Sequence, residues 1–201
     1  MSSHDRKIDM QFQKNSKQLR VLLSTGLALV CSALTGHGAD ISYAGTGNND
    51  RWENSANWNG GTIPNDSATG AAFNQAGTQV ILDASTSALS RGFMLGMYGA
   101  TNSGTVEGGT LDCTWLDIGR CNQNGGNGTL TVSGGQITVS GALSIPTQFS
   151  TQVDPNKIGQ GHLELLGGII SATTLHIGNG QTGANGGVGT LHITDGTLIL
   201  Q

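Results

Sequence analysis

A phrase of alternating apolar residues and glycine corners recurs four times in the second half of the chain, and it constrains the fold more than any other feature. The first corner positions of the four copies are Gly108, Gly134, Gly167 and Asp195. They are separated by 26, 33 and 28 residues, so the copies differ mainly in their loops. A repeat of this length built from short strands is typical of a solenoid, whose units stack into one continuous core.

The spacing of the apolar residues within each copy indicates strands rather than helices. Leu130 and Val132 alternate with threonines, which places the aliphatic side chains on one face of a pleated strand. Three short strands per turn, with equivalent strands stacked in parallel, define a parallel β-helix of about four to five turns over residues 77–201. We therefore expect Leu130, Leu163 and Leu191 to lie over one another. A β-sandwich is the competing all-β fold, but it gives no reason for like residues to recur at matching positions.

The first 39 residues differ in composition from the rest and predict a secretory signal peptide. They hold five of the nine Lys and Arg residues, then an uncharged apolar stretch over 21–34 and small residues around Gly38 and Ala39. The fourteen residues of that stretch are fewer than the roughly 20 that a membrane-spanning helix needs. We expect cleavage near Gly38 or Ala39 and no transmembrane span in the mature chain. An uncleaved anchor and lipidation at Cys31 are the alternatives.

Removal of the signal peptide would leave an acidic chain with few charges. Residues 40–201 hold four basic and eleven acidic side chains, a net charge of −7. Because no basic stripe remains to neutralise phosphate, we expect no nucleic-acid partner. None of the histidines has further ligands at a recognised spacing, so we expect no metal. Cys113 is predicted to point inward and Cys121 to lie in a loop, which favours two free thiols and leaves a disulfide open.

Large aromatic residues are concentrated in the segment over residues 40–76. A solenoid exposes the hydrophobic end of its first turn, and large rings laid over that end would close it. We therefore interpret this segment as an N-terminal cap. The alternative is that Trp52 and Trp58 stack on sugar rings through their flat faces.

Part of the chain is similar to a known group of proteins. Trp52, Asn57, Trp58 and Pro64, followed by the sequences GTLTVSGGQITV and LHIG, resemble bacterial exported β-helical repeat proteins with autotransporter-type β-strand repeats, some of which carry PEP-CTERM sorting tails. The resemblance covers most of residues 40–201. It implies a β-helical stalk on the cell surface or outside the cell.

Two sets of polar residues fall at matching positions of successive repeats. Asp117, Ser144 and His176 share one outward position and are the residue types of a hydrolase triad. A triad needs the histidine between the nucleophile and the carboxylate, whereas here the serine lies between the other two, so we expect a solvated polar row. Glu164 and His192 also share a position and are expected to form an exposed ion pair of small energy.

Two further motifs do not support catalysis. A GxGxxG match over residues 178–183 precedes a predicted strand and not a helix, which excludes a dinucleotide site. Lyases and hydrolases built on β-helices group several acids with a basic residue on one outer face, whereas the acids of these repeats are scattered and only Arg120 and Lys157 supply a cation. We therefore predict no catalytic residues and no cofactor.

The sequence thus favours a secreted or cell-surface β-helical stalk with a structural or adhesive role and no catalytic activity. Surface glycans or other cell-surface proteins are the expected partners. The alternative function is a carbohydrate-binding module or a fragment of a β-helical polysaccharide lyase or hydrolase. The C-terminal turn is incomplete and ends over residues 198–201 without a polar closing segment. We expect it to continue in a longer protein or to make an end-to-end contact.

Overall fold

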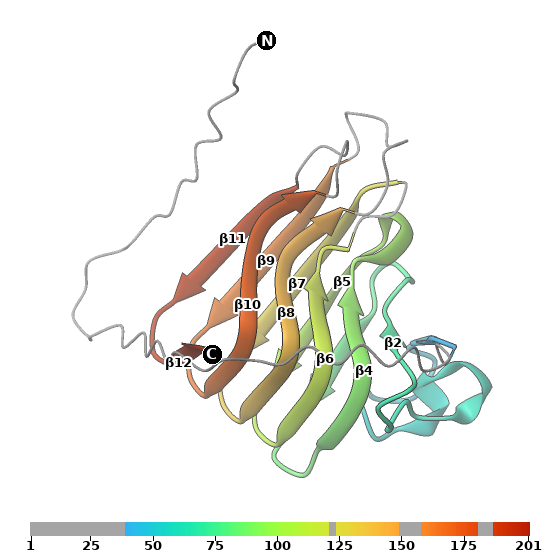
Figure 1. Cartoon of the computed structure of the whole chain (residues 1–201). Helices are drawn as coiled ribbons and strands as arrows, with labels where there is room; N and C mark the ends of the chain where they lie inside the picture. The colour runs from blue at the N-terminus through green and yellow to red at the C-terminus, as the bar shows by residue number, and fades with distance from the viewer. Residues whose placement is uncertain (1–38, 121–123, 149–157, 181–186) are drawn as a thin grey trace.

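Most of the described residues lie in β-strands, which form two parallel sheets, and there is almost no helix among them (Figure 1). The computed structural model describes residues 39–120, 124–148, 158–180 and 187–201. The predicted all-β class is confirmed. The signal peptide expected over residues 1–39 lies outside the described residues except for Ala39.

From β2 onward, successive strands alternate between the two sheets. The seven-stranded sheet has, in spatial order, the strands β1 (Ile41–Ser42), β2 (Ala71–Ala72), β4 (Ser87–Leu95), β6 (Thr110–Ile118), β8 (Gln136–Gln148), β10 (Ile169–Gly180) and β12 (Thr197–Leu200). The five-stranded sheet has, in spatial order, β11 (Val188–Ile193), β9 (Gly159–Leu165), β7 (Gly126–Val132), β5 (Thr101–Val106) and β3 (Gln79–Leu82). From β3 onward the chain crosses to the other sheet after every strand, as Figure 1 shows, so each strand pairs in parallel with the second strand after it.

The repeated aliphatic residues form columns that run across the strands. Leu130 of β7 is the register partner of Leu163 of β9, which in turn pairs with Leu191 of β11. Leu130 and Leu163 are fully buried, and Leu191 packs against the same core. The predicted stacking of these three leucines is therefore confirmed. A second column in the other sheet consists of Leu111, Ile137, Ile170 and Leu198.

The long strands of the seven-stranded sheet are bent. The register between β6 and β8 shifts between Cys113 and Leu116, and the register between β8 and β10 shifts between Ala172 and Thr174. Such an irregularity bends a strand and interrupts the alternation of its side chains. Each repeat therefore has one long bent strand and one short strand where we expected three short ones. The corner glycines behave as predicted, because Gly135 and Gly168 adopt φ values of 74° and 75°.

The segment before the repeats continues both sheets at the β4 end of the molecule. β1 pairs with β2, and β2 pairs with β4. In the five-stranded sheet, Arg51 forms a parallel bridge with Ile81 of β3. The Trp52 amide donates a hydrogen bond to the Ile81 carbonyl at 3.0 Å. The edge of the five-stranded sheet is thus partly paired. The short 3-10 helices of the described residues are η1 (Ser55–Asn57), η2 (Asn59–Gly61) and η3 (Met97–Gly99).

A column of inward-facing glycines lies against the backbone of the seven-stranded sheet. Gly128, Gly161 and Gly189 are register partners in β7, β9 and β11. A Cβ atom on Gly161 would overlap the carbonyl oxygen of Ile118, which is backbone of the other sheet and cannot turn away. The glycine at this position in the last three repeat phrases is therefore required by the packing of one sheet against the other, whereas the first phrase has Asn102 there.

We expect Gly161→Ala to lower the free energy of unfolding by about 1–3 kcal/mol, because the added methyl group overpacks a rigid backbone contact. Urea denaturation followed by far-UV circular dichroism measures the effect. Gly104→Ala is the matched control: Gly104 faces the same core from β5, and its added Cβ would meet side-chain carbons, the nearest being Leu130 Cδ1 at 3.1 Å. Equal losses in the two variants would contradict the proposed close approach of the sheets.

Candidate functional site

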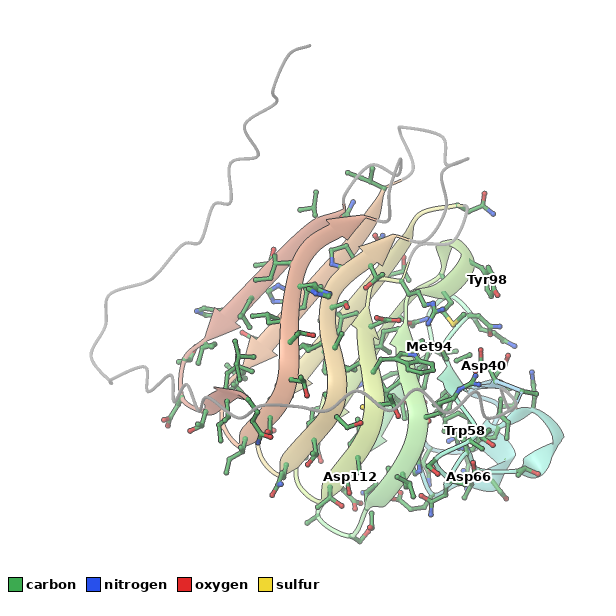
Figure 2. All side chains as sticks on the ribbon, viewed as in Figure 1. Asp40, Trp58, Asp66, Met94, Tyr98 and Asp112 are labelled. Atoms are coloured by element: carbon green, nitrogen blue, oxygen red, sulfur yellow. The ribbon has the colours of Figure 1, made fainter. Side chains whose placement is uncertain are left out.

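The two tryptophans that were candidates for sugar stacking are part of the core. Trp52 and Trp58 are each 2% exposed. The Trp58 ring lies 4.8 Å from the Trp52 ring and 5.0 Å from the Tyr43 ring, both edge to face, and Trp58 Nε1 donates to the Trp52 carbonyl at 2.9 Å. Figure 2 shows Trp58 in the segment beside β4. Neither ring presents an open face, so this geometry argues against the stacking interpretation of Trp52 and Trp58.

A buried amide holds the loop that carries these rings. The Asn57 side chain is fully buried and donates from Nδ2 to the carbonyls of Asn49 at 2.6 Å and Arg51 at 3.0 Å. Its Oδ1 accepts from the Gly47 amide at 2.7 Å. One side chain therefore satisfies three backbone groups of a loop that has few regular hydrogen bonds of its own. The sequence drew attention to Asn57 only through the resemblance and gave no sign of this role.

The polar row of Asp117, Ser144 and His176 has the predicted register but not the predicted exposure. The three residues are partners on β6, β8 and β10. Asp117 and Ser144 are each only 3% exposed, whereas His176 is exposed. The expectation of a solvated row is therefore wrong for its first two members. The serine lies between the other two residues and hydrogen-bonds to the carboxylate, so the order that a triad needs is absent.

Asp117 is covered by its own loop. Arg120 folds back so that Nη1 lies 2.9 Å from Asp117 Oδ2 and 2.8 Å from Met94 Sδ. Thr147 Oγ1 donates to Asp117 Oδ1 at 3.2 Å. Burial raises the pKa of the Asp117 carboxyl, and the Arg120 guanidinium opposes this shift in the pKa. The ion pair joins β6 to the loop that follows it, and the hydrogen bonds of Thr147 and Ser144 to Asp117 tie β6 to β8.

The predicted pair of Glu164 and His192 is present on the outer face of the five-stranded sheet. His192 Nδ1 lies 3.7 Å from Glu164 Oε1, and both side chains are partly exposed. Such a pair contributes less than about 1 kcal/mol.

Beside this pair lies a shallow groove on the outer face of β7, β9 and β11. Its volume is about 220 Å³. Its lining residues are Asn127, Gly128, Thr129, Gln160, Gly161, His162, Val188 and Thr190. Thr129, His162 and Thr190 are register partners on these three strands. The sequence gave no sign of this groove, because the depth of a groove depends on the heights of neighbouring side chains.

The remaining sequence candidates add no site. Cys113 is a buried free thiol, as expected, whereas Cys121 lies outside the described residues. Lys157 and half of the GxGxxG match, residues 181–183, also lie outside them. Among the described residues no group of three His, Cys, Asp or Glu side chains could hold a metal ion. No helix in the described ranges is long and apolar enough to cross a membrane.

Comparison with known proteins gives no relative: no family model, curated protein or solved structure matches the chain. Within the part of the chain that the structure describes, the groove on β7, β9 and β11 is the candidate functional site. It is concave, polar and open to solvent.

Proposed function

We propose that the chain is an exported parallel β-helix with a structural or adhesive role and no catalytic activity. The observation that supports this most strongly is the in-register column of Leu130, Leu163 and Leu191. Residues that recur in sequence lie over one another in space, and the chain alternates between two parallel sheets. A rod of this kind is rigid and presents repeated outward positions along its axis, which suits a stalk or an adhesive surface.

Two features support a role without catalysis. The one row with triad residue types is in the wrong order, and its carboxylate is covered by Arg120. The ionisable side chain that lines the groove is His162, and the groove lining contains no carboxylate and no thiol. General acid–base chemistry on a glycosidic bond uses two carboxyl groups on either side of the bond.

A carbohydrate-binding role is the second candidate, and the groove favours it over the tryptophans. Its polar side chains are amides, hydroxyls and one imidazole, which donate and accept hydrogen bonds without carrying a fixed charge. This candidate is compatible with an adhesive function, because an adhesive stalk needs a surface that binds another molecule. A lyase or hydrolase fragment has no such support among the described residues.

Export is tested by expressing the full chain with a C-terminal tag in a Gram-negative host. We expect the product outside the cytoplasm, with an intact mass that lacks the first 38 or 39 residues. Leu27→Arg, which places a charge in the apolar stretch, should stay in the cytoplasm at full mass. Ala68→Arg adds the same charge at an exposed position and should be exported like the natural chain. Full-length cytoplasmic product from all three chains would overturn the proposal.

A further inference from the structure

The groove on β7, β9 and β11 is lined by side chains that have hydrogen-bonding capacity to spare. Gln160, His162 and Thr190 form no side-chain hydrogen bond with any other described residue. Each of these groups can both donate and accept. A ligand that offers several hydroxyl groups would find partners of both kinds in one place.

The polar positions recur along the axis of the rod. One row runs through Thr101, Asn127, Gln160 and Val188, and the next through Ser103, Thr129, His162 and Thr190. Successive members are one strand spacing apart, about 4.8 Å. A groove of about 220 Å³ is smaller than the roughly 300–1,000 Å³ of a site that encloses a whole small molecule. The arrangement therefore suits a chain that passes over the rod and is held by several weak contacts, because linked contacts add to its affinity.

The charges on this face select against an acidic chain. The groove contains no Lys or Arg side chain. Glu164 lies on the same face, in register with His192, one outward position beyond His162. Residues 40–201 carry a net charge of −7, which repels an acidic polymer further. Val188 is the apolar side chain in the lining, which is too little apolar surface for a hydrophobic peptide.

We infer that this groove binds a neutral, hydroxyl-rich polysaccharide, with Gln160 and His162 as the central hydrogen-bonding residues. This inference rests on the proposed adhesive function and names its partner. The ligand lies across β7, β9 and β11 along the outward rows. The aromatic cap takes no part in binding, since Trp52 and Trp58 are buried.

Binding is tested by isothermal titration of the exported protein with four probes: cellohexaose, chitohexaose and mannohexaose, which are neutral, and oligogalacturonate, which is acidic. We expect at least one neutral probe to bind and the acidic probe not to bind. Gln160→Ala/His162→Ala should weaken that binding at least tenfold. Gln136→Ala/Thr138→Ala, which changes two outward positions of β8 in the other sheet, should leave it unchanged.

Several results would overturn the inference. These are the absence of binding to all neutral probes, equal binding by the Gln160→Ala/His162→Ala variant, or preferential binding of oligogalacturonate. His162→Thr places the residue type of the neighbouring strands at this position and serves as a second variant that preserves the fold. If the protein is exported and folded but binds no probe, the proposed ligand is wrong, whereas the proposed structural role stands. A protein that binds but is retained in the cytoplasm would overturn the proposed export instead.

Discussion

Trp58→Ala is expected to lower the free energy of unfolding by about 3–5 kcal/mol, the cost of removing a fully buried aromatic ring. Trp58 contacts the rings of Tyr43 and Trp52 and lies 5.8 Å from the Phe73 ring. Its removal opens a cavity in the aromatic cluster and deletes the hydrogen bond to the Trp52 carbonyl. Urea denaturation followed by far-UV circular dichroism measures the loss.

Two controls separate packing from the other contributions of Trp58. Trp58→Phe keeps a ring and loses the indole N–H, so it should cost less than the alanine variant. Leu89→Ala removes an outward side chain that is 41% exposed and should change the free energy of unfolding by less than about 1 kcal/mol. A Trp58→Ala variant of natural stability that has lost sugar binding would contradict the packing role and restore the stacking interpretation.

Arg120→Met is expected to destabilise the protein strongly at pH 7 and only weakly at pH 4. Removing one partner of a buried ion pair costs about 3–5 kcal/mol, because the other charge stays buried without compensation. Asp117 is that charge, and burial already raises the pKa of its carboxyl in the folded state. Without Arg120 this pKa should rise further, since the guanidinium is the main group that lowers it.

The direction of the pH dependence follows from the raised pKa of Asp117. A carboxyl with a raised folded-state pKa binds its proton more tightly in the folded than in the unfolded protein. Its contribution to stability is fully present below the unfolded pKa of about 3.9 and is lost as the pH rises through the folded pKa. The Arg120→Met variant should therefore approach the stability of the natural chain near pH 4 and fall well below it at pH 7.

Denaturation of three variants at both pH values tests this prediction. Adding Asp117→Asn to Arg120→Met removes the buried charge and should recover most of the lost stability at pH 7. Glu164→Gln breaks the exposed pair with His192 and should change stability by less than about 1 kcal/mol at either pH. A loss in Arg120→Met that is the same at pH 4 and pH 7 would show that the ion pair is not its cause.

The aliphatic columns could be predicted from the sequence because like residues recur at positions with the same side-chain direction. The column of Leu130, Leu163 and Leu191 could be predicted from the repeat period and from the recurrence of apolar residues at every second position. The bend between Cys113 and Leu116 could not be predicted in this way. The bend is a local irregularity that shifts the register between β6 and β8. The residue types around it do not distinguish it from a regular strand.

The environment of the polar residues depended on tertiary contacts that a sequence does not display. Alternation placed Asp117 on the outer side of β6, but Arg120 returns over it from the following loop and removes it from solvent. The aromatic composition of this segment favoured a cap and left a sugar platform as the alternative, and the burial of both tryptophans supports the cap. The outward row of Thr129 and His162 was visible in the repeats, whereas its concavity was not.

Disulfide formation between designed cysteine pairs tests the in-register stacking most directly. In a chain whose natural cysteines are replaced by serine, Thr131→Cys/Glu164→Cys joins register partners on β7 and β9, about one strand spacing apart. Mild oxidation followed by mass spectrometry should show a disulfide in this pair. It should show none in Thr131→Cys/His192→Cys, whose Cα atoms lie about two strand spacings, roughly 10 Å, apart and beyond disulfide reach. Cross-linking of the second pair but not the first would contradict the stacked architecture.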